Sequence, residues 1–194
     1  MNAVLSGLAL ALTLALFVPY GRALVQGRTR PHPVSWLIWA SGTALVFAAQ
    51  IAGGGGIGAW PIGVSALLSF GIAALAMRRR APRQITRTDA LCLAAALTAL
   101  PAWWLTQDPL VAVVLLTSSD LLGFVPTLRR SWWHPHEERA AFYALGALRN
   151  ALVVAALEHH NLTTVLFPAA VGVACVLLAT VLPWRRRVLD RPGA

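Results

Sequence analysis

The chain has 194 residues, of which 58% are hydrophobic and only 12% are charged. Its mean hydropathy of +0.67 exceeds what the core of a soluble domain of this size can bury, which excludes an ordinary soluble protein and predicts lipid as the solvent. All 16 basic residues are arginine, and a formal charge of +9 is typical of the cytoplasmic flanks of membrane helices as well as of nucleic-acid binders.

Seven apolar windows come within a few residues of the ~20 that a helix needs to cross the hydrocarbon core. They cover residues 2–20, 34–51, 57–77, 88–106, 109–128, 138–157 and 161–184. The first window lacks a positive leader and a convincing cleavage site, so we expect it to be retained. The windows are rich in Ala and Leu and continuously apolar, which predicts helices rather than the alternating strands of a barrel.

The positions of the arginines predict the orientation of the chain. Fifteen of them lie after the first, third, fifth and seventh windows, and with seven crossings all four of these segments share one side. The positive-inside rule makes that side cytoplasmic. We therefore expect a multi-pass protein of the cell (plasma) membrane, with its N-terminus outside and its C-terminus in the cytoplasm.

The connections on the opposite side are too short for a soluble domain or a nucleic-acid reading module, so no nucleic-acid partner is predicted. They cover residues 53–56, 107–108 and 158–161. The glycine run at 53–56 is interpreted as a tight turn, because it lacks the strand and helix context of a nucleotide-binding loop.

The chain also resembles itself. At an offset of 107 the motif FVP at 17–19 recurs at 124–126, and at an offset of 104 the pair PH at 31–32 recurs at 135–136. We interpret these ordered matches as a duplication, since chance similarity among Ala/Leu-rich helices would give only scattered Leu matches. The predicted units are a first three-helix repeat at 1–86, a linker helix at 87–107, and a second repeat at 108–194. Four spans separate equivalent helices, so the two repeats are parallel.

This all-α arrangement, three helices plus one plus three, resembles the PQ-loop superfamily, which includes the SWEET and SemiSWEET sugar transporters. The resemblance is carried by FVPYGRALVQGRTRPHPVSWLIW at 17–39 and FVPTLRRSWWHPHEERAAFY at 124–143. It implies a divergent SWEET-like scaffold of seven transmembrane helices, in a family where homo-oligomers occur. Tyr20 and Thr127 stand where the family has glutamine, and helices three and seven lack the asparagines of the sugar pocket. The resemblance therefore predicts the scaffold rather than a sugar substrate.

Two charged residues lie near the middle of the predicted spans, Asp120 and Arg149, at similar depth. An unpaired charge there costs about 2.5 to 3.5 kcal/mol on insertion scales, so we expect the two to pair or to face a wet cavity. In one interpretation Arg149 and Asn150 bind an anionic or amide-bearing ligand, with Asp120 as partner or proton-linked gate. In the other the two charges form a structural ion pair.

Four further residues complete the candidate site. Trp39 and Tyr143 occupy matched positions in the second and sixth helices and are candidates to flank a pocket. Pro19 and Pro126 each remove a backbone donor, so they either act as hinges or end their helices. The histidines fall on opposite faces of the membrane, so neither a metal site nor a cofactor is predicted.

These features predict a small-solute transporter that works by alternating access, with a polar or anionic substrate. Its partners are the lipid bilayer and that solute, and it requires a cavity between the first, second, fifth and sixth helices. A non-transporting receptor or accessory subunit on the same scaffold is the alternative. An enzyme is not predicted, because only residues 118–120 come near a convergent set of reactive groups.

Overall fold

The computed structural model describes residues 1–27, 33–78, 87–133, 135–137 and 140–190. This part of the chain is all-helical, which confirms the predicted fold class at that level. The α-helices are α1 (Asn2–Val25), α2 (Pro33–Ala52), α3 (Trp60–Arg78), α4 (Arg87–Thr106), α5 (Pro109–Trp133), α6 (Ala140–Ala156) and α7 (Leu162–Leu189). Two 3-10 helices, η1 (Gly56–Ala59) and η2 (Pro135–Glu137), precede α3 and α6.

Three helical segments are long and apolar enough to cross a membrane: α1, η1 with α3, and α7. The other four helices contain shorter apolar stretches, at Trp36–Ala52, Leu93–Thr106, Pro109–Leu122 and Ala140–Ala156. A membrane-embedded helical protein is the class that this composition fits.

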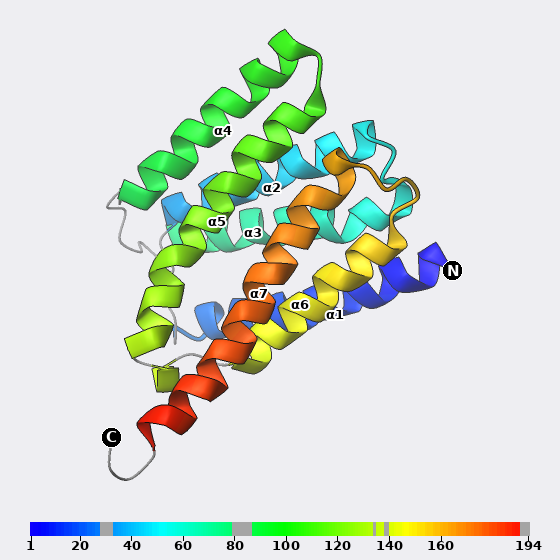
Figure 1. Ribbon diagram of the computed structural model, residues 1–194. Helices are drawn as coiled ribbons and strands as arrows, with labels where there is room; N and C mark the ends of the chain where they lie inside the picture. The colour runs from blue at the N-terminus through cyan, green and yellow to red at the C-terminus, as the bar shows by residue number, and fades with distance from the viewer. Residues whose placement is uncertain (28–32, 79–86, 134, 138–139, 191–194) are drawn as a thin grey trace.

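The helices form two groups of three, which we name the first triplet (α1 to α3) and the second triplet (α5 to α7). In the first triplet α3 packs against both α1 and α2, and in the second α7 packs against both α5 and α6. Between the triplets α1 packs against α6, and α2 packs against α5 (Figure 1). The remaining helix, α4, packs against α5 and α2.

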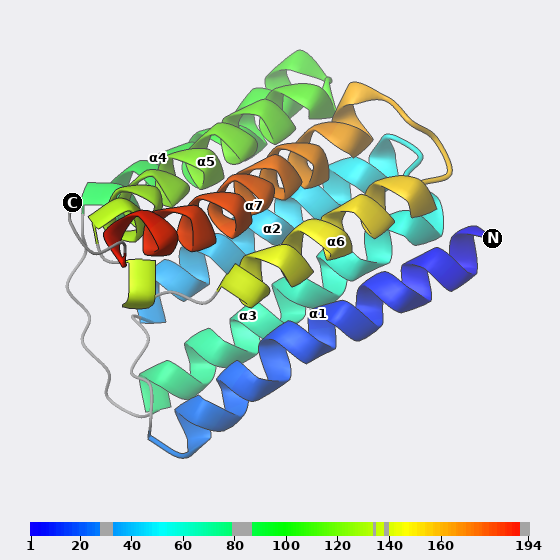
Figure 2. The ribbon, with the colours of Figure 1, turned by 60° about the horizontal axis from the view of Figure 1, so that its bottom comes forward.

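The bundle has two unlike ends (Figure 2). At the loop end lie the N-terminus and the short connections at 53–59, 107–108 and 157–161. At the arginine end lie the last turns of α1, α3, α5 and α7, where α3 finishes at Arg78 and α7 carries Arg186 and Arg187 in its last turn.

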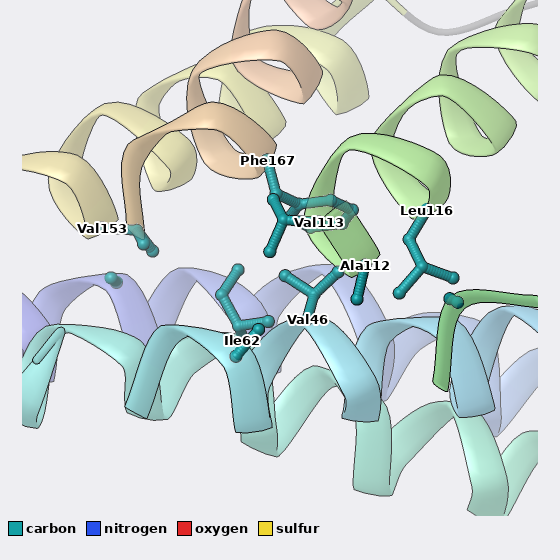
Figure 3. Close-up of a cluster of buried hydrophobic side chains, with 10 residues drawn as sticks. Val46, Ile62, Ala112, Val113, Leu116, Val153 and Phe167 are labelled. Carbon is teal, nitrogen blue, oxygen red and sulfur yellow. The ribbon is translucent and has the colours of Figure 1, made fainter. Parts of the chain in front are cut away.

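The buried apolar core that joins the triplets lies toward the loop end. Side chains from all seven α-helices meet in this cluster (Figure 3): Ala9, Val46, Ala49, Ile62, Ala99, Ala112, Val113, Leu116, Val153 and Phe167. A second cluster lies closer to the arginine end, and its buried members, Tyr143, Cys175, Leu178 and Leu182, come from α6 and α7 alone. The triplets therefore share a core at one end of the molecule.

The glycine run forms a tight connection, as predicted, and also packs closely against the second triplet. Gly54 and Gly56 adopt positive φ angles of 82° and 57°, which side-chain-bearing residues rarely adopt. A Cβ on Gly58 would overlap the backbone of Ala156 and Leu157. Only glycine at position 58 allows the start of η1 and the end of α6 to approach this closely.

A proline explains one contact between the triplets. Pro168 has no backbone N–H, so the carbonyl of Thr164, four residues earlier in α7, loses its helical partner. Gln50 of α2 supplies the missing donor, with Nε2 at 2.7 Å from the Thr164 oxygen. This hydrogen bond is buried, and it joins the two triplets near the loop end.

Candidate functional site

Arg149 of α6 is the centre of a buried polar cluster. Its side chain is 8% exposed, and its Nε donates to Thr13 Oγ1 at 3.1 Å. Its Nη2 donates to the carbonyl of Pro61 at 2.8 Å and to Ser65 Oγ at 3.1 Å. Its Nη1 donates to Asn150 Oδ1 at 3.2 Å. We call these five residues the Arg149 cluster.

The acceptors in this cluster are oriented by bonds to their own helices. Thr13 donates its hydroxyl to the carbonyl of Ala9 at 2.8 Å, and Ser65 donates to that of Ile62 at 2.9 Å. Asn150 donates its amide to the carbonyl of Gly146 at 2.9 Å. The hydroxyl groups of Thr13 and Ser65 and the amide of Asn150 thus donate to backbone carbonyls. Their side-chain oxygens accept from the guanidinium.

Most of the bonds from Arg149 cross between the triplets. Thr13 lies on α1, whereas Pro61 and Ser65 lie on α3, so a single side chain of α6 joins two helices of the first triplet. All four acceptors are neutral. Among the described residues Arg149 has no carboxylate partner, so a buried positive charge is balanced by dipoles alone.

The structure does not bring Asp120 and Arg149 together as an ion pair within the described part of the chain. The packing of the triplets explains this. Asp120 of α5 matches Thr13 of α1 in the repeat, and α1 packs against α6 whereas α5 packs against α2. On the α5 face that meets α2, Leu116 lies 3.5 Å from the position of a Cβ on Gly42, and Asp120 follows one turn later. The similar depth predicted for the two charges therefore did not place them at one interface.

The two aromatic candidates have different surroundings. Trp39 is 39% exposed, and its ring lies edge-on to that of Trp36 at 5.9 Å between centroids. Tyr143 is buried with Cys175 in the cluster near the arginine end. Neither is a hydrogen-bond partner of Arg149, whereas Asn150, the third predicted neighbour, is one.

The two candidate hinge positions lie inside helices. Pro19 lies within α1, which runs on to Val25, and α5 runs on to Trp133, past position 126. The interpretation that these prolines end their helices is therefore excluded. Both helices extend five residues beyond the spans predicted to end at 20 and 128.

Three of the cavities are lined by described residues alone. The largest of the three has a volume of about 470 Å³ and lies between α1 and α3. The others, of about 260 Å³ and 160 Å³, are lined by α4 with Gln107 and by α5 with α7. Arg149 and Asp120 line none of the three, so these cavities do not supply the central cavity expected between the first, second, fifth and sixth helices. In this conformation Arg149 is enclosed by protein.

Sequence reasoning missed the side chains that surround Arg149. Thr13 and Ser65 are isolated polar residues in apolar helices, which is a recognisable signal, but the Pro61 acceptor is a backbone carbonyl that no side-chain pattern reveals. Two residues of the histidine clusters, 32 and 134, lie outside the described residues. Among the described residues, no group of three His, Cys, Asp or Glu side chains is placed to hold a metal ion.

Comparison with known proteins gives no match: no family model, no curated protein and no solved structure is similar to this chain.

Proposed function

We propose that this protein is a small-solute carrier that alternates between two conformations by moving the first triplet relative to the second. In this proposal the chain crosses the membrane seven times, with α4 as the linker between two parallel repeats on a PQ-loop, SWEET-like scaffold. The loop end faces outside and the arginine end faces the cytoplasm.

The matched packing of the triplets supports this layout. In each triplet the third helix contacts the other two, and the pairs α1–α6 and α2–α5 exchange under the repeat equivalence. Two parallel repeats related by an axis along the membrane normal produce this pattern. The other four α-helices, of 17 to 25 residues, also fall within the ~17–25 residues of a spanning helix.

The observation that carries the proposal is the set of hydrogen bonds that joins the two triplets toward one end of their interface. Toward the loop end the triplets share hydrogen bonds: Arg149 with Thr13, Pro61 and Ser65; Gln50 with Thr164; Glu158 with Gly55 and Ile57; and Asn161 with Gly53.

At the arginine end, several contacts of the described residues lie within one triplet. Arg185 and Arg186 donate to the carbonyls of Trp132 and Pro135 at 3.0 and 2.9 Å, inside the second triplet. Phe17 and Tyr20 contact the ring of Trp36 inside the first, at 6.3 and 5.1 Å between centroids. Hydrogen bonds that join the two triplets at one end are what a carrier closed on that side requires.

Arg149 provides the link between conformational change and substrate. Opening the loop end must break its bonds to α1 and α3, and each hydrogen bond from a charged donor contributes about 1.5 to 3 kcal/mol. A bound anion would replace the lost acceptors and balance the charge. The substrate we propose is therefore a small polar solute with an anionic group, bound by Arg149 and Asn150.

A flux assay tests this proposal. Proteoliposomes containing the full chain would be screened for uptake of radiolabelled organic anions, amino acids and sugars, each against empty liposomes. We expect uptake of an organic anion that Arg149→Leu lowers at least tenfold, whereas Arg187→Leu, which removes an exposed arginine at the far end of α7, leaves it unchanged. Uptake equal to that of empty liposomes for every solute would exclude the carrier.

The alternative is a receptor or accessory subunit. The enclosed position of Arg149 is compatible with this function, because a receptor needs no path through the protein. A receptor on this scaffold would bind an anion without moving it. Binding in detergent that depends on Arg149, combined with no flux in liposomes, would support this function instead.

A further inference from the structure

A groove separate from the Arg149 cluster runs between the arginine-end halves of α1 and α3. Its volume of about 470 Å³ falls within the ~300–1,000 Å³ of ordinary ligand pockets. Its walls are almost entirely apolar, and they include Val18, Leu68, Ile72 and Leu75. Figure 2 shows α1 and α3 side by side at the edge of the bundle, away from α5 and α7.

Two glycines leave the groove open. Gly21 of α1 and Gly71 of α3 both line it, and a Cβ built on either residue meets no atom within 4 Å. Leu67, on the same wall, is 70% exposed. The groove is thus an outward-facing hollow between two helices rather than a closed void in the core.

The surroundings of the groove indicate what fills it. Both α1 and α3 belong to segments long and apolar enough to cross a membrane, so the hollow opens toward acyl chains. On α1 it extends from Phe17 to Gln26, which is about 13 Å at ~1.5 Å per residue. That length is close to one leaflet of a hydrocarbon core about 30 Å thick.

Charge distinguishes the kind of lipid. Arg22 lines the groove, and no carboxylate among the described residues pairs with it. The α3 wall ends at Arg78, which is exposed at the same end of the molecule. A phosphate group placed there would meet an unpaired guanidinium at the headgroup level.

We propose that this groove is a binding site for an anionic phospholipid, with one acyl chain between α1 and α3 and the headgroup phosphate on Arg22. The site is independent of the carrier function, because it shares no residue with the Arg149 cluster. It gives the protein a fixed anionic lipid at the arginine end.

Native mass spectrometry of the purified full chain tests the proposal, with phosphatidylglycerol and phosphatidylcholine of identical acyl chains as probes. We expect phosphatidylglycerol to be retained about fivefold more strongly, the effect of about one basic residue at the membrane surface. Arg22→Gln should remove this preference, and Gly71→Leu, which fills the hollow, should reduce retention of both lipids.

Matched controls accompany each variant. Gly7→Leu adds the same side chain to another open position of α1, outside the groove, and Arg187→Gln removes an exposed arginine of α7 at the same end of the molecule. Both should bind lipid like the wild type, and helical circular dichroism should be the same for all variants. Retention that neither Arg22→Gln nor Gly71→Leu alters would overturn the proposal. A wild-type dimer that Gly71→Leu converts to a monomer would also overturn it, by assigning the groove to a second copy of this chain.

Discussion

At the scale of single residues, the Arg149 cluster satisfies a buried cation without an anion. Thr13 and Ser65 present oxygens that are oriented by bonds to their own helices, and the Pro61 carbonyl completes the set. Buried hydrogen bonds of this kind are strong in a low-dielectric surrounding, and the loss of one partner is costly because the other is left without water. The cluster therefore contributes to stability as well as to the proposed binding site.

Replacement of Thr13 by valine tests the structural contribution. The change keeps the shape of the side chain but removes the acceptor of Arg149 Nε, so the buried N–H loses its partner. We expect the free energy of unfolding in detergent to fall by about 1 to 3 kcal/mol. Thr98→Val is the control, since the exposed Thr98 hydroxyl bonds only to carbonyls of its own helix. Equal losses in the two variants would show that the cross-helix bond adds nothing.

Gly58 offers a second test at this scale. A Cβ at this position would overlap the backbone of Ala156 and Leu157, and backbone cannot move aside as a flexible side chain can. We expect Gly58→Ala to lower the unfolding free energy by about 1 to 3 kcal/mol, as overpacking does in cores. Gly7→Ala, in open space, should leave it unchanged or raise it slightly. Unfolding in detergent, followed by circular dichroism, measures both, and an unaffected Gly58→Ala would mean that η1 and α6 can separate freely.

At the scale of elements, several prolines lie inside helices rather than at their ends. Pro19, Pro101, Pro168 and Pro183 all lie within helices that continue beyond them. A helix in lipid tolerates proline when a neighbouring group satisfies the freed carbonyl. Gln50 does this for Thr164, so one element supplies what another lacks.

A double-mutant cycle tests this pairing of elements. Gln50→Leu should lower the unfolding free energy by about 1 to 3 kcal/mol, because the buried Thr164 carbonyl is left unsatisfied. In a Pro168→Ala background the restored N–H can bond that carbonyl, so the same change should cost less. Chemical denaturation of the four proteins gives the coupling energy. A cost that is the same in both backgrounds would contradict the explanation.

At the scale of the whole molecule, the loop end holds the two triplets together. The shared core and the cross-triplet bonds lie toward the loop end, and the buried members of the second cluster, closer to the arginine end, come from α6 and α7. Motion about the loop end would separate the triplets at the arginine end. Motion that opens the loop end must disrupt the Arg149 cluster.

Distances between spin labels test whether the arginine end moves more than the loop end. Labels at Val4 and Leu162 report on the loop end and labels at Met77 and Leu189 on the arginine end, all at exposed positions, in a variant without Cys92 and Cys175. We expect a narrow distribution of distances for the first pair and a broad or double one for the second. Arg149→Gln should broaden the loop-end distribution, whereas Arg187→Gln should not. A loop end as variable as the arginine end in the wild type would contradict the proposed motion.

The sequence by itself determined that the protein is helical and apolar enough for a membrane, and it gave the place of each helix along the chain. It could do so because a continuous apolar run in lipid must satisfy its backbone internally, and this requirement is local. Helix ends were less certain: Pro19 suggested a stop at residue 20, but the bonds of the next turns carry α1 to Val25.

Only the tertiary structure decided which residues meet Arg149. The sequence gives depth along each helix, and Asp120 and Arg149 have similar depths, but it does not give the face that each helix turns toward its neighbours. Helices that are apolar on every side carry no stripe to fix that face. The facing sides are set by close packing of small residues such as Gly42 and Gly58, and by the pairing of α1 with α6 and of α2 with α5. This packing placed Thr13, Pro61 and Ser65 around the guanidinium instead of Asp120.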